Sequence, residues 1–344
     1  MIRSIDVRNF RCFRRLNVAD CSRLNVIVGD NGAGKTALME AIFLPLATSS
    51  EVGLRMRQQR GIDGAFQGEA NKIERALWGS FFHNNDMNEP ISLTLEGDGP
   101  ESRSLEISRA RSESSLKIGE YGERRDTGIC FTWKDSAGDF REASPSVGEK
   151  LTFPSTGEIM PNFFYYAANQ TIGSVEVASR FSDLSQANDH RKFIELFSKE
   201  YPWIKDMNVE VYGGSPVLFA TLANGQKQPV PNVSSGINRI VAFMLAIANS
   251  TNGVVIVDEI ENGIHYSHMA GIWRLLLSFA RDFDCQLFIS THSQECLSAL
   301  SKASGKSLDD ISLWQIERGE KESSIRQFDG EDLKLALDYH EEVR

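Results

Sequence analysis

Blocks of apolar and polar positions along the chain predict alternating strands and helices. Two short, predominantly apolar runs, at 24–29 and 254–257, are typical of strands buried on both faces. Apolar residues at helical spacing follow at 36–44, where Pro45 is expected to end the helix, and at about 267–283. This alternation favours a largely parallel α/β sheet. Further strands are predicted at 2–10, 162–170, 207–214, 217–230 and 286–290, and helices at 187–201, 237–248 and after 290.

Residues 51–160 have a different character. They are polar and rich in Gly, Ser, Arg and Glu, with short strand candidates at 91–95, 105–108 and 129–133. No sustained heptad pattern runs through them, so we expect no long coiled coil here. The segment is predicted to be a β- and loop-rich insertion.

The stretch GDNGAGKTALMEAIF, residues 29–43, joins a predicted strand to a predicted helix. It fits the pattern G-x-x-x-x-G-K-[ST], in which glycines let successive backbone N–H groups point at a phosphate and the helix N-terminus adds its positive end. Lys35 is expected to reach the β- and γ-phosphates of ATP, and the Thr36 hydroxyl to ligate Mg²⁺. The residues predicted to bind the nucleotide here are Asn31, Gly32, Ala33, Gly34, Lys35 and Thr36.

A second candidate stretch, VVIVDE at 254–259, is an apolar strand that ends in two carboxylates. Asp258 can hold Mg²⁺ through water, and Glu259 can polarise the water that attacks the γ-phosphate. The alternative is a solvated strand end, but the phosphate loop upstream favours the catalytic interpretation.

Two weaker stretches allow both a structural and a functional interpretation. NVSSGINR at 232–239 precedes an apolar helix, so Ser234, Ser235 and Gly236 either cap that helix or contact a γ-phosphate. LFISTHS at 287–293 places His292 at the end of an apolar strand, where it is either structural or a hydrogen-bond partner of the γ-phosphate.

Charge leaves the question of nucleic-acid binding open. The 344 residues carry 37 Lys and Arg against 47 Asp and Glu, a net charge of −10, and a uniformly acidic protein repels nucleic acid. However, residues 1–23 hold six arginines, and Arg55, Arg57 and Arg60 form a second basic cluster. These arginines are interpreted either as a solvated face or as a nucleic-acid contact.

The cysteines and the apolar runs bear on the compartment. Five scattered cysteines without a CxxC indicate reduced thiols in a cytoplasmic protein, not a disulfide or zinc framework. The longest apolar run, 240–248, is too short to span a bilayer, and the first residues lack the apolar region of a secretory signal. We therefore expect no membrane partner.

Taken in order, the phosphate loop, Ser-Ser-Gly, Asp-Glu and Thr-His-Ser resemble the head of an ABC-type ATPase. DEIENGIH and STHS look most like stand-alone prokaryotic ABC ATPases of the OLD and related defence families, and IDVRNFRCFRRLNV is similar to the first strands of those proteins and of RecF and SMC heads. The resemblance covers about 1–45 and 160–320. It implies an α/β P-loop NTPase fold of ABC-ATPase head type, with a mostly parallel central sheet, an antiparallel β subdomain and an inserted β- and loop-rich region.

The resemblance also implies a domain organisation and roles for single residues. We expect one head over 1–344, with a first lobe at 1–50, the insertion at 51–160 and a second lobe at 161–344. Glu259 would be the catalytic glutamate and His292 the switch histidine. Ser234 to Gly236 would be the signature motif, which contacts ATP bound by another subunit, with Asn262-Gly263 at the seam between them. Gln170 is the candidate magnesium-site glutamine, with Gln58 and Gln59 as rivals.

This sequence differs from the families that it resembles in three respects. The signature lacks the usual leucine and first glycine, no coiled-coil arm is present, and the chain after Lys302 is too short for the Toprim nuclease domain of OLD proteins. An alternative metal site of Glu261, His265 and His268 on one helical face is disfavoured, since these residues would belong to the loop after Glu259 and the next helix.

The expected function is a cytoplasmic, Mg²⁺-dependent ATPase that forms a head-to-tail homodimer or higher oligomer. It would control a separate effector, a nuclease or toxin, in prokaryotic antiphage defence. A RecF-like clamp that closes on DNA with ATP is the main alternative, which makes nucleic acid the open partner. A nucleotide sensor without turnover is the third hypothesis, and Glu259 argues against it.

Overall fold

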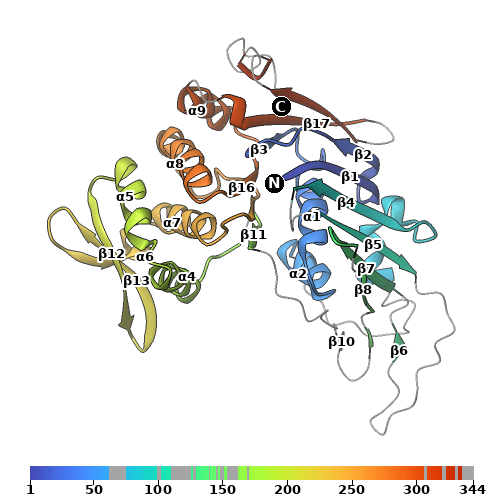
Figure 1. Cartoon of the computed structure of the whole chain (residues 1–344), viewed down its shortest axis with the longest axis horizontal. Helices are drawn as coiled ribbons and strands as arrows, with labels where there is room; N and C mark the ends of the chain where they lie inside the picture. Colours follow the sequence, from blue (N-terminus) through green and yellow to red (C-terminus); the bar gives the residue numbers. More distant parts are fainter. Residues whose placement is uncertain are drawn as a thin grey trace, which may run out of the picture. The chain divides into compact units, whose positions relative to one another are not determined.

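The computed structural model describes residues 1–61, 75–98, 102–109, 125–126, 129–138, 140–144, 146–147, 151–152, 162–168, 170–305, 308–319, 323–329 and 332–334. Part of the predicted insertion therefore lies outside the described residues. The chain forms two compact units (Figure 1). Unit 1 comprises Met1–Cys21, Gly29–Pro161 and Ile316–Arg326, and unit 2 comprises Ser22–Val28, Asn162–Gln315 and Gln327–Arg344.

Unit 1 is built on a six-stranded antiparallel sheet in the order β2-β1-β4-β5-β7-β8. Buried and less buried residues alternate along β4, β5 and β7, which gives the sheet one apolar face. The helix that follows the phosphate loop, α1 (Lys35–Leu46), contacts β1, β4 and β5. The strands are β1 (Ile2–Phe10), β2 (Phe13–Val18), β4 (Ile91–Gly97), β5 (Arg103–Arg109), β7 (Ile129–Asp135) and β8 (Phe140–Ala143).

The strands predicted within the insertion are confirmed by β4, β5 and β7. A small second sheet in the same unit has the order β10-β9-β6. Further elements among the described residues of unit 1 include α2 (Glu51–Gln59), η1 (Gly79–Phe81), η2 (His83–Asn85), β6 (Arg125–Asp126), β9 (Ser146–Val147) and β10 (Leu151–Thr152).

The prediction that Pro45 ends the first helix was wrong, because α1 continues through Pro45 to Leu46. A proline in the last turn removes only one N–H donor from the helix ladder. The neighbouring carbonyl of Leu44 is satisfied by the Trp133 indole N–H at 3.3 Å, and both Leu44 and Leu46 are buried. Packing therefore outweighs the local breaking effect of the proline.

Unit 2 contains most of the predicted parallel sheet, in the order β11-β15-β16-β3-β17-β18. The pairs β11–β15, β15–β16, β16–β3 and β3–β17 are parallel, which confirms the predicted sheet type. β3, β15 and β16 are buried along their whole length, as their mostly apolar sequences indicate. The strands are β3 (Leu24–Val28), β11 (Phe163–Tyr166), β15 (Val254–Val257), β16 (Gln286–Ser290), β17 (Ile311–Arg318) and β18 (Ser323–Asp329).

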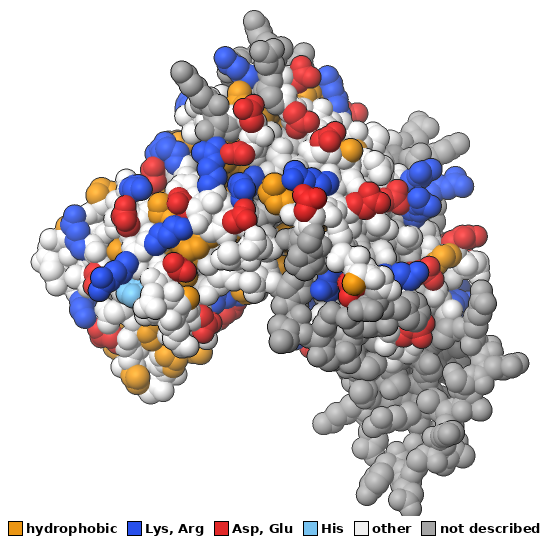
Figure 2. All heavy atoms as spheres, viewed as in Figure 1, with side chains coloured by type: hydrophobic (Ala, Val, Ile, Leu, Met, Phe, Trp, Pro, Cys, Tyr) orange, Lys and Arg blue, Asp and Glu red, His pale blue; other side chains and the backbone are white. Residues whose placement is uncertain are grey.

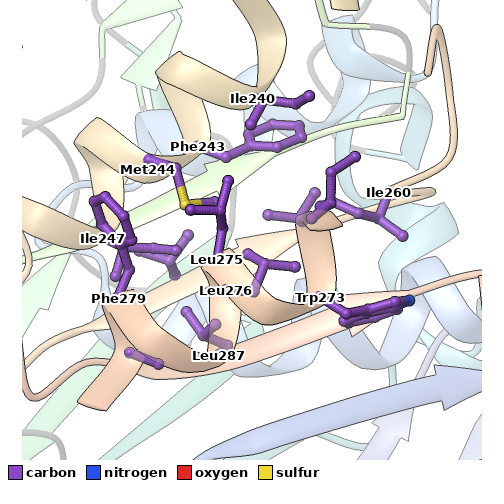
Figure 3. Packing of buried hydrophobic residues seen from close by; sticks show 14 of the residues in the cluster. Ile240, Phe243, Met244, Ile247, Ile260, Trp273, Leu275, Leu276, Phe279 and Leu287 are labelled. Carbon is purple, nitrogen blue, oxygen red and sulfur yellow. The ribbon is translucent and has the colours of Figure 1, made fainter. Parts of the chain in front are cut away.

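Helices α7 (Ser235–Ala248) and α8 (Met269–Asp282) pack together beside this sheet. Figure 3 shows Phe243 and Met244 of α7 facing Leu275 of α8, with Leu287 of β16 beneath. α7 is apolar almost all round and buried from Ile240 to Ala248, as expected for a helix inside a core. This core fixes both the start of α7 and the ends of β15 and β16, where the candidate residues lie.

The rest of unit 2 includes a three-stranded antiparallel sheet, β12-β13-β14. Helix α4 and strands β17 and β18 were missed in the sequence. The buried residues of α4, Val177, Ala178, Phe181 and Leu184, do recur at helical spacing, whereas β17 and β18 mix polar and apolar residues. No described helix has the length and apolarity needed to cross a membrane. The elements are α4 (Ser174–Gln186), α5 (His190–Glu200), β12 (Ile204–Tyr212), β13 (Ser215–Leu222), β14 (Lys227–Pro229), α6 (Val230–Val233), η4 (Tyr266–His268), α9 (Gln294–Ser304) and η5 (Leu308–Asp310).

Candidate nucleotide site

The phosphate loop of unit 1 begins at Gly29, directly after β3, and leads into α1. The Lys35 side chain is 7% exposed, and its ammonium group donates to the carbonyl oxygens of Gly29 at 2.6 Å and Asp30 at 3.1 Å. The lysine therefore lies over its own loop instead of extending into solvent. Thr36 is half-buried in the first turn of α1, and the exposed loop residues include Asn31 and Gly32. The arrangement concentrates positive charge and helix N–H groups at one loop, which suits a phosphate.

Gly34, the N-cap of α1, has φ +124°, a conformation that residues with a Cβ rarely adopt. A Cβ at this position would lie 2.7 Å from the Cys12 sulfur and 2.9 Å from the Phe13 ring. The turn at Cys12 thus packs directly against the phosphate loop. Only glycine satisfies both the backbone conformation and the space.

We expect Gly34→Ala to lower the free energy of unfolding by about 2 kcal/mol or more, since it adds backbone strain and a clash with buried atoms. Urea denaturation of the two proteins measures this difference. Gly138→Ala is the matched control, because Gly138 also has a positive φ, +84°, but has nothing within 4 Å of the added Cβ. Equal losses in the two variants would contradict a role for close packing at Gly34.

A buried carboxylate holds the N-terminal turn to α1. The Glu40 side chain is 2% exposed and accepts hydrogen bonds from Arg11 Nε at 3.0 Å and from Arg60 Nε at 2.7 Å. Burial lowers the pKa of Arg11, and the charge of Glu40 opposes this shift. Arg57 is 6% exposed and donates to the carbonyl of Leu77. Arg11 comes from the arginine-rich residues 1–23 and Arg57 from the second basic cluster. The interpretation of these arginines as a solvated face was wrong for both, since they hold parts of unit 1 together.

In unit 2, Asp258 and Ser290 meet where β15 and β16 end. The carboxyl ends of parallel neighbours lie at the same edge of a sheet. Asp258 is 3% exposed and accepts a hydrogen bond from the Ser290 hydroxyl, which in turn accepts one from the backbone N–H of Glu259 at 2.8 Å. The serine thus orients the aspartate and fixes the start of the next turn.

A magnesium ion is compatible with these residues. Mg²⁺ prefers hard oxygen ligands and is usually held by one or two protein groups, waters and substrate phosphates. Within unit 2 the carboxylate of Asp258 is such a ligand, and within unit 1 so is the hydroxyl of Thr36. Among the described residues no group of three or more His, Cys, Asp or Glu side chains could hold a metal by itself.

Glu259 has a left-handed backbone conformation, with φ +50°. For a residue with a Cβ this conformation costs energy, and such strain is concentrated at functional sites. Its side chain is held by Asn262, whose amide donates to Glu259 Oε2 at 2.6 Å and to the carbonyl oxygen of Ala168 at 3.2 Å. The carboxylate is thereby aimed by a residue three positions later in the same turn.

His292 is held by Glu261, a contact that the sequence did not predict. Glu261 Oε1 accepts from the His292 backbone N–H at 2.9 Å and lies 2.9 Å from His292 Nδ1. Glu259 Oε1 is farther from the same nitrogen, at 3.9 Å. The structure therefore brings both predicted catalytic side chains, Glu259 and His292, into one cluster.

The signature residues lie at the start of α7. Ser234 and Ser235 are exposed, and Ser234 is the N-cap residue, but its side chain makes no cap hydrogen bond. The hypothesis that this stretch is only a helix cap thus lacks its expected bond. A Cβ at Gly236 would lie 3.4 Å from the carbonyl oxygen of Gly263, so the signature and the Asn262-Gly263 turn pack together within unit 2.

The remaining predicted residues have other surroundings. Gln170 lies four residues after β11, and its side-chain oxygen accepts from the backbone N–H of Ala167 at 3.2 Å. Gln58 is exposed near the end of α2. The side chain of the third candidate, Gln59, lies outside the described part of the chain.

The helical face suggested for Glu261, His265 and His268 was wrong. Residues 259–263 form a turn, and helix α8 begins only at Met269. His265 Nδ1 pairs with the Ser267 hydroxyl at 2.8 Å instead.

Sequence reasoning missed three residues that build the cluster: Ser290, Glu261 and Arg239. Arg239, one turn after the signature, donates to the carbonyl of Ala168 at 3.3 Å. Burial lowers the pKa of Arg239, and the charges of Glu259 and Glu261 oppose that shift. A polar residue at the end of an otherwise apolar strand was the available signal for Ser290. Glu261 and Arg239 reach the cluster through contacts between turns that are distant in the sequence. No local sequence pattern indicates such contacts.

Comparison with known proteins identifies the family. Residues 24–298 match the model of the AAA_21 family, described as "AAA domain, putative AbiEii toxin, Type IV TA system". The chain therefore belongs to this family. A relative named ATP/GTP phosphatase, from Helicobacter pylori, is 22% identical over 338 residues, covering 88% of each chain.

Other relatives match this chain over a smaller share of their own length. RecF of Lactobacillus acidophilus is 24% identical over 164 residues, 48% of this chain and 39% of that protein. Structural maintenance of chromosomes protein 6 of Saccharomyces cerevisiae is 24% identical over 220 residues, 60% of this chain but 20% of that protein.

Solved structures show the fold. An SMC head bound to the C-terminal winged-helix domain of ScpA aligns with a TM-score of 0.55 at 12% identity, covering 96% of this chain and 98% of that chain. An SMC head with an extended coiled coil, from a Pyrococcus furiosus complex, gives 0.51 at 11% identity, covering 100% and 99%. The predicted fold and the resemblance to RecF and SMC heads are confirmed: this is an ABC-type P-loop ATPase of the RecF and SMC-head group. The likeness to OLD proteins stays a prediction.

Proposed function

We propose that this AAA_21 protein binds ATP with Mg²⁺ and hydrolyses it at a site shared between two copies of the chain. The observation that carries the proposal is the phosphate loop, in which the buried Lys35 ammonium and the N-terminus of α1 provide positive charge to the same loop. The Helicobacter pylori relative, named ATP/GTP phosphatase, supports turnover.

In this mechanism each residue has a defined role. The loop from Asn31 to Thr36 would bind the phosphates. Thr36 and Asp258 carry the oxygens that would hold Mg²⁺, and when bound the ion would supply positive charge at the phosphates. Glu259 orients and deprotonates the attacking water, and His292 contacts the γ-phosphate. Ser234, Ser235 and Gly236 of the second copy complete the site, and Gln170 is the proposed glutamine near the metal.

The wider role is proposed from the family. The family description names a "putative AbiEii toxin" of a two-component toxin–antitoxin system, which supports a partner protein and a role in prokaryotic antiphage defence. That the partner is a separate effector, a nuclease or toxin controlled by this ATPase, is proposed from the resemblance to stand-alone defence ATPases. Both SMC heads are bound to domains of ScpA, which supports a partner protein for this fold. Free cysteines, five in number, support a reducing, cytoplasmic location.

A DNA clamp like RecF is the second candidate, favoured by the sequence similarity to RecF. The structure argues against the N-terminal arginines as its contact. Four of the six are ion-paired: Arg3 with Asp98, Arg8 with Asp6, Arg11 with Glu40 and Arg23 with Asp284. On the face shown in Figure 2, basic and acidic side chains of the described residues are interspersed. A salt titration of DNA binding tests this candidate, since a clamp gives a steep loss of affinity with salt.

The proposed function predicts that Lys35→Ala weakens ATP binding by about 10–100-fold, the loss of charge-assisted hydrogen bonds to phosphate. Equilibrium binding of a fluorescent ATP analogue measures this affinity, and phosphate release measures turnover. Lys199→Ala removes an exposed lysine on α5 and serves as the control. Unchanged affinity in Lys35→Ala would remove the phosphate-loop assignment.

A further inference from the structure

We propose that Glu261 is a positioning residue that fixes the tautomer and the orientation of the His292 ring. The inference deepens the proposed function, on which the catalytic role of His292 rests. The contact itself is a property of unit 2 and can be measured without ATP.

One oxygen of Glu261 lies against two nitrogens of His292. Glu261 Oε1 accepts a hydrogen bond from the backbone N–H of His292 at 2.9 Å, and it lies 2.9 Å from Nδ1 of the same residue. The hydrogen bond fixes the loop after β16, and the close approach to Nδ1 orients the ring. The Glu261 side chain is 14% exposed against 44% for His292, so the carboxylate is the anchored partner and the imidazole the accessible one.

The contact with Glu261 determines which nitrogen of the His292 ring carries the hydrogen. An ionised carboxylate only accepts hydrogen bonds, so Nδ1 must carry a hydrogen when it pairs with Glu261. In the neutral ring the free lone pair is then on Nε2, the other nitrogen. A protonated ring would present an Nε2–H donor to a phosphate while keeping the same bond to Glu261. The contact between Glu261 and His292 is therefore compatible with both the neutral and the protonated ring.

Glu261 and Glu259 differ in the groups that their carboxylates contact. Glu259 Oε1 is 3.9 Å from His292 Nδ1, beyond hydrogen-bond distance, and Glu259 Oε2 accepts from Asn262 at 2.6 Å. Each carboxylate thus has its own partner. Glu259 remains available for water, whereas Glu261 is used to hold the histidine.

An arginine accompanies the two acidic side chains of the cluster. Arg239 lies close enough for its charge to interact with both Glu259 and Glu261. Among the described residues, Arg239 Nε and Glu261 Oε2 are buried atoms without a hydrogen-bond partner. A cation on α7 thus stabilises negative charge in this turn.

Nuclear magnetic resonance of the full chain labelled with ¹⁵N-histidine tests the proposal in alkaline buffer, where a free imidazole is neutral. The chain has six histidines, and the signal that disappears in His292→Gln identifies His292. We expect the Nδ1–H tautomer in the wild type and a shift toward the commoner Nε2–H tautomer in Glu261→Ala. Glu261→Gln keeps an oxygen that can accept both bonds, so it should restore the Nδ1–H form.

The same variants predict a kinetic pattern. Glu261→Ala should lower kcat by about 10–100-fold, as loss of an orienting partner does, with KM nearly unchanged. Glu261→Gln should recover most of this loss. Glu295→Ala is the matched control, since this carboxylate lies three residues after His292 but accepts from the Ser293 hydroxyl instead.

The outcomes separate this inference from the proposed function. An unchanged His292 tautomer in Glu261→Ala overturns the inference, whatever the ATPase rate. A tautomer shift without any wild-type ATP hydrolysis supports the contact and overturns the proposed function instead. If Glu261→Ala does not fold, a Glu261→Gln protein with the Nε2–H tautomer contradicts the inference by itself.

Discussion

Glu259→Gln is expected to bind ATP with wild-type affinity and to hydrolyse it at least about 100-fold more slowly, the range that general-base catalysis supplies. The amide has nearly the size of the carboxylate, and its oxygen can still accept the 2.6 Å bond from Asn262. The strained backbone at φ +50° should be kept, since the side chain beyond Cβ barely changes. What is lost is the negative charge that accepts the proton of the attacking water.

Two measurements test this expectation. Equilibrium binding of an ATP analogue should be unchanged, while phosphate release under saturating ATP should fall. The control is Glu195→Gln, which alters an exposed carboxylate on α5 with a side chain 76% exposed. Hydrolysis by Glu259→Gln at the wild-type rate would show that another group is the base.

A second consequence distinguishes lost chemistry from lost binding. A variant that binds ATP but does not hydrolyse it should accumulate the ATP-bound dimer. Light scattering with ATP should then report a larger mass for Glu259→Gln than for the wild type at the same concentration. If Glu259→Gln stays monomeric with ATP, the proposal that ATP joins two copies of the chain is contradicted.

The parallel sheet could be predicted because its strands are buried on both faces. LNVIV, VVIV and QLFIS are dominated by apolar residues, and each corresponds to an observed strand; the one polar residue inside LNVIV, Asn25, is buried and hydrogen-bonded to Ser22 and Leu287. The phosphate loop could be predicted because its chemistry is local, with glycine, lysine and threonine all in one short segment. Strand β17 was not predicted, although most of it is buried, because its sequence ISLWQIER mixes polar and apolar residues.

The contacts of the catalytic side chains could not be predicted for a different reason. Glu261 and His292 are 31 residues apart, and their bond depends on how the turns after β15 and β16 are placed. In the sequence, Glu261 was considered only in a disfavoured alternative, a metal site with His265 and His268 on one helical face. The chain instead makes a turn through the left-handed Glu259 before helix α8 begins.

Ser234→Arg is expected to leave ATP binding by each subunit intact and to reduce hydrolysis at least about 100-fold, since a shared site needs the signature of the second copy. Ser234 is exposed and extended, with φ −172° and ψ 141°, so an arginine can be accommodated without strain in its own subunit. The long side chain would instead enter the space of the partner's nucleotide. Ser179→Arg, at an exposed serine of α4, is the control for adding an arginine to unit 2.

Mixing Ser234→Arg with Lys35→Ala subunits tests whether the site is shared. Neither variant alone should hydrolyse ATP, but in a mixed dimer one intact phosphate loop faces one intact signature. With random assortment half of the dimers are mixed and each has one working site of two, so about one quarter of wild-type turnover should return. The unmixed variants, measured at the same total concentration, provide the baseline. If Ser234→Arg alone hydrolyses ATP normally as a monomer, or if mixing restores nothing although light scattering shows mixed dimers, the site is not shared between two copies.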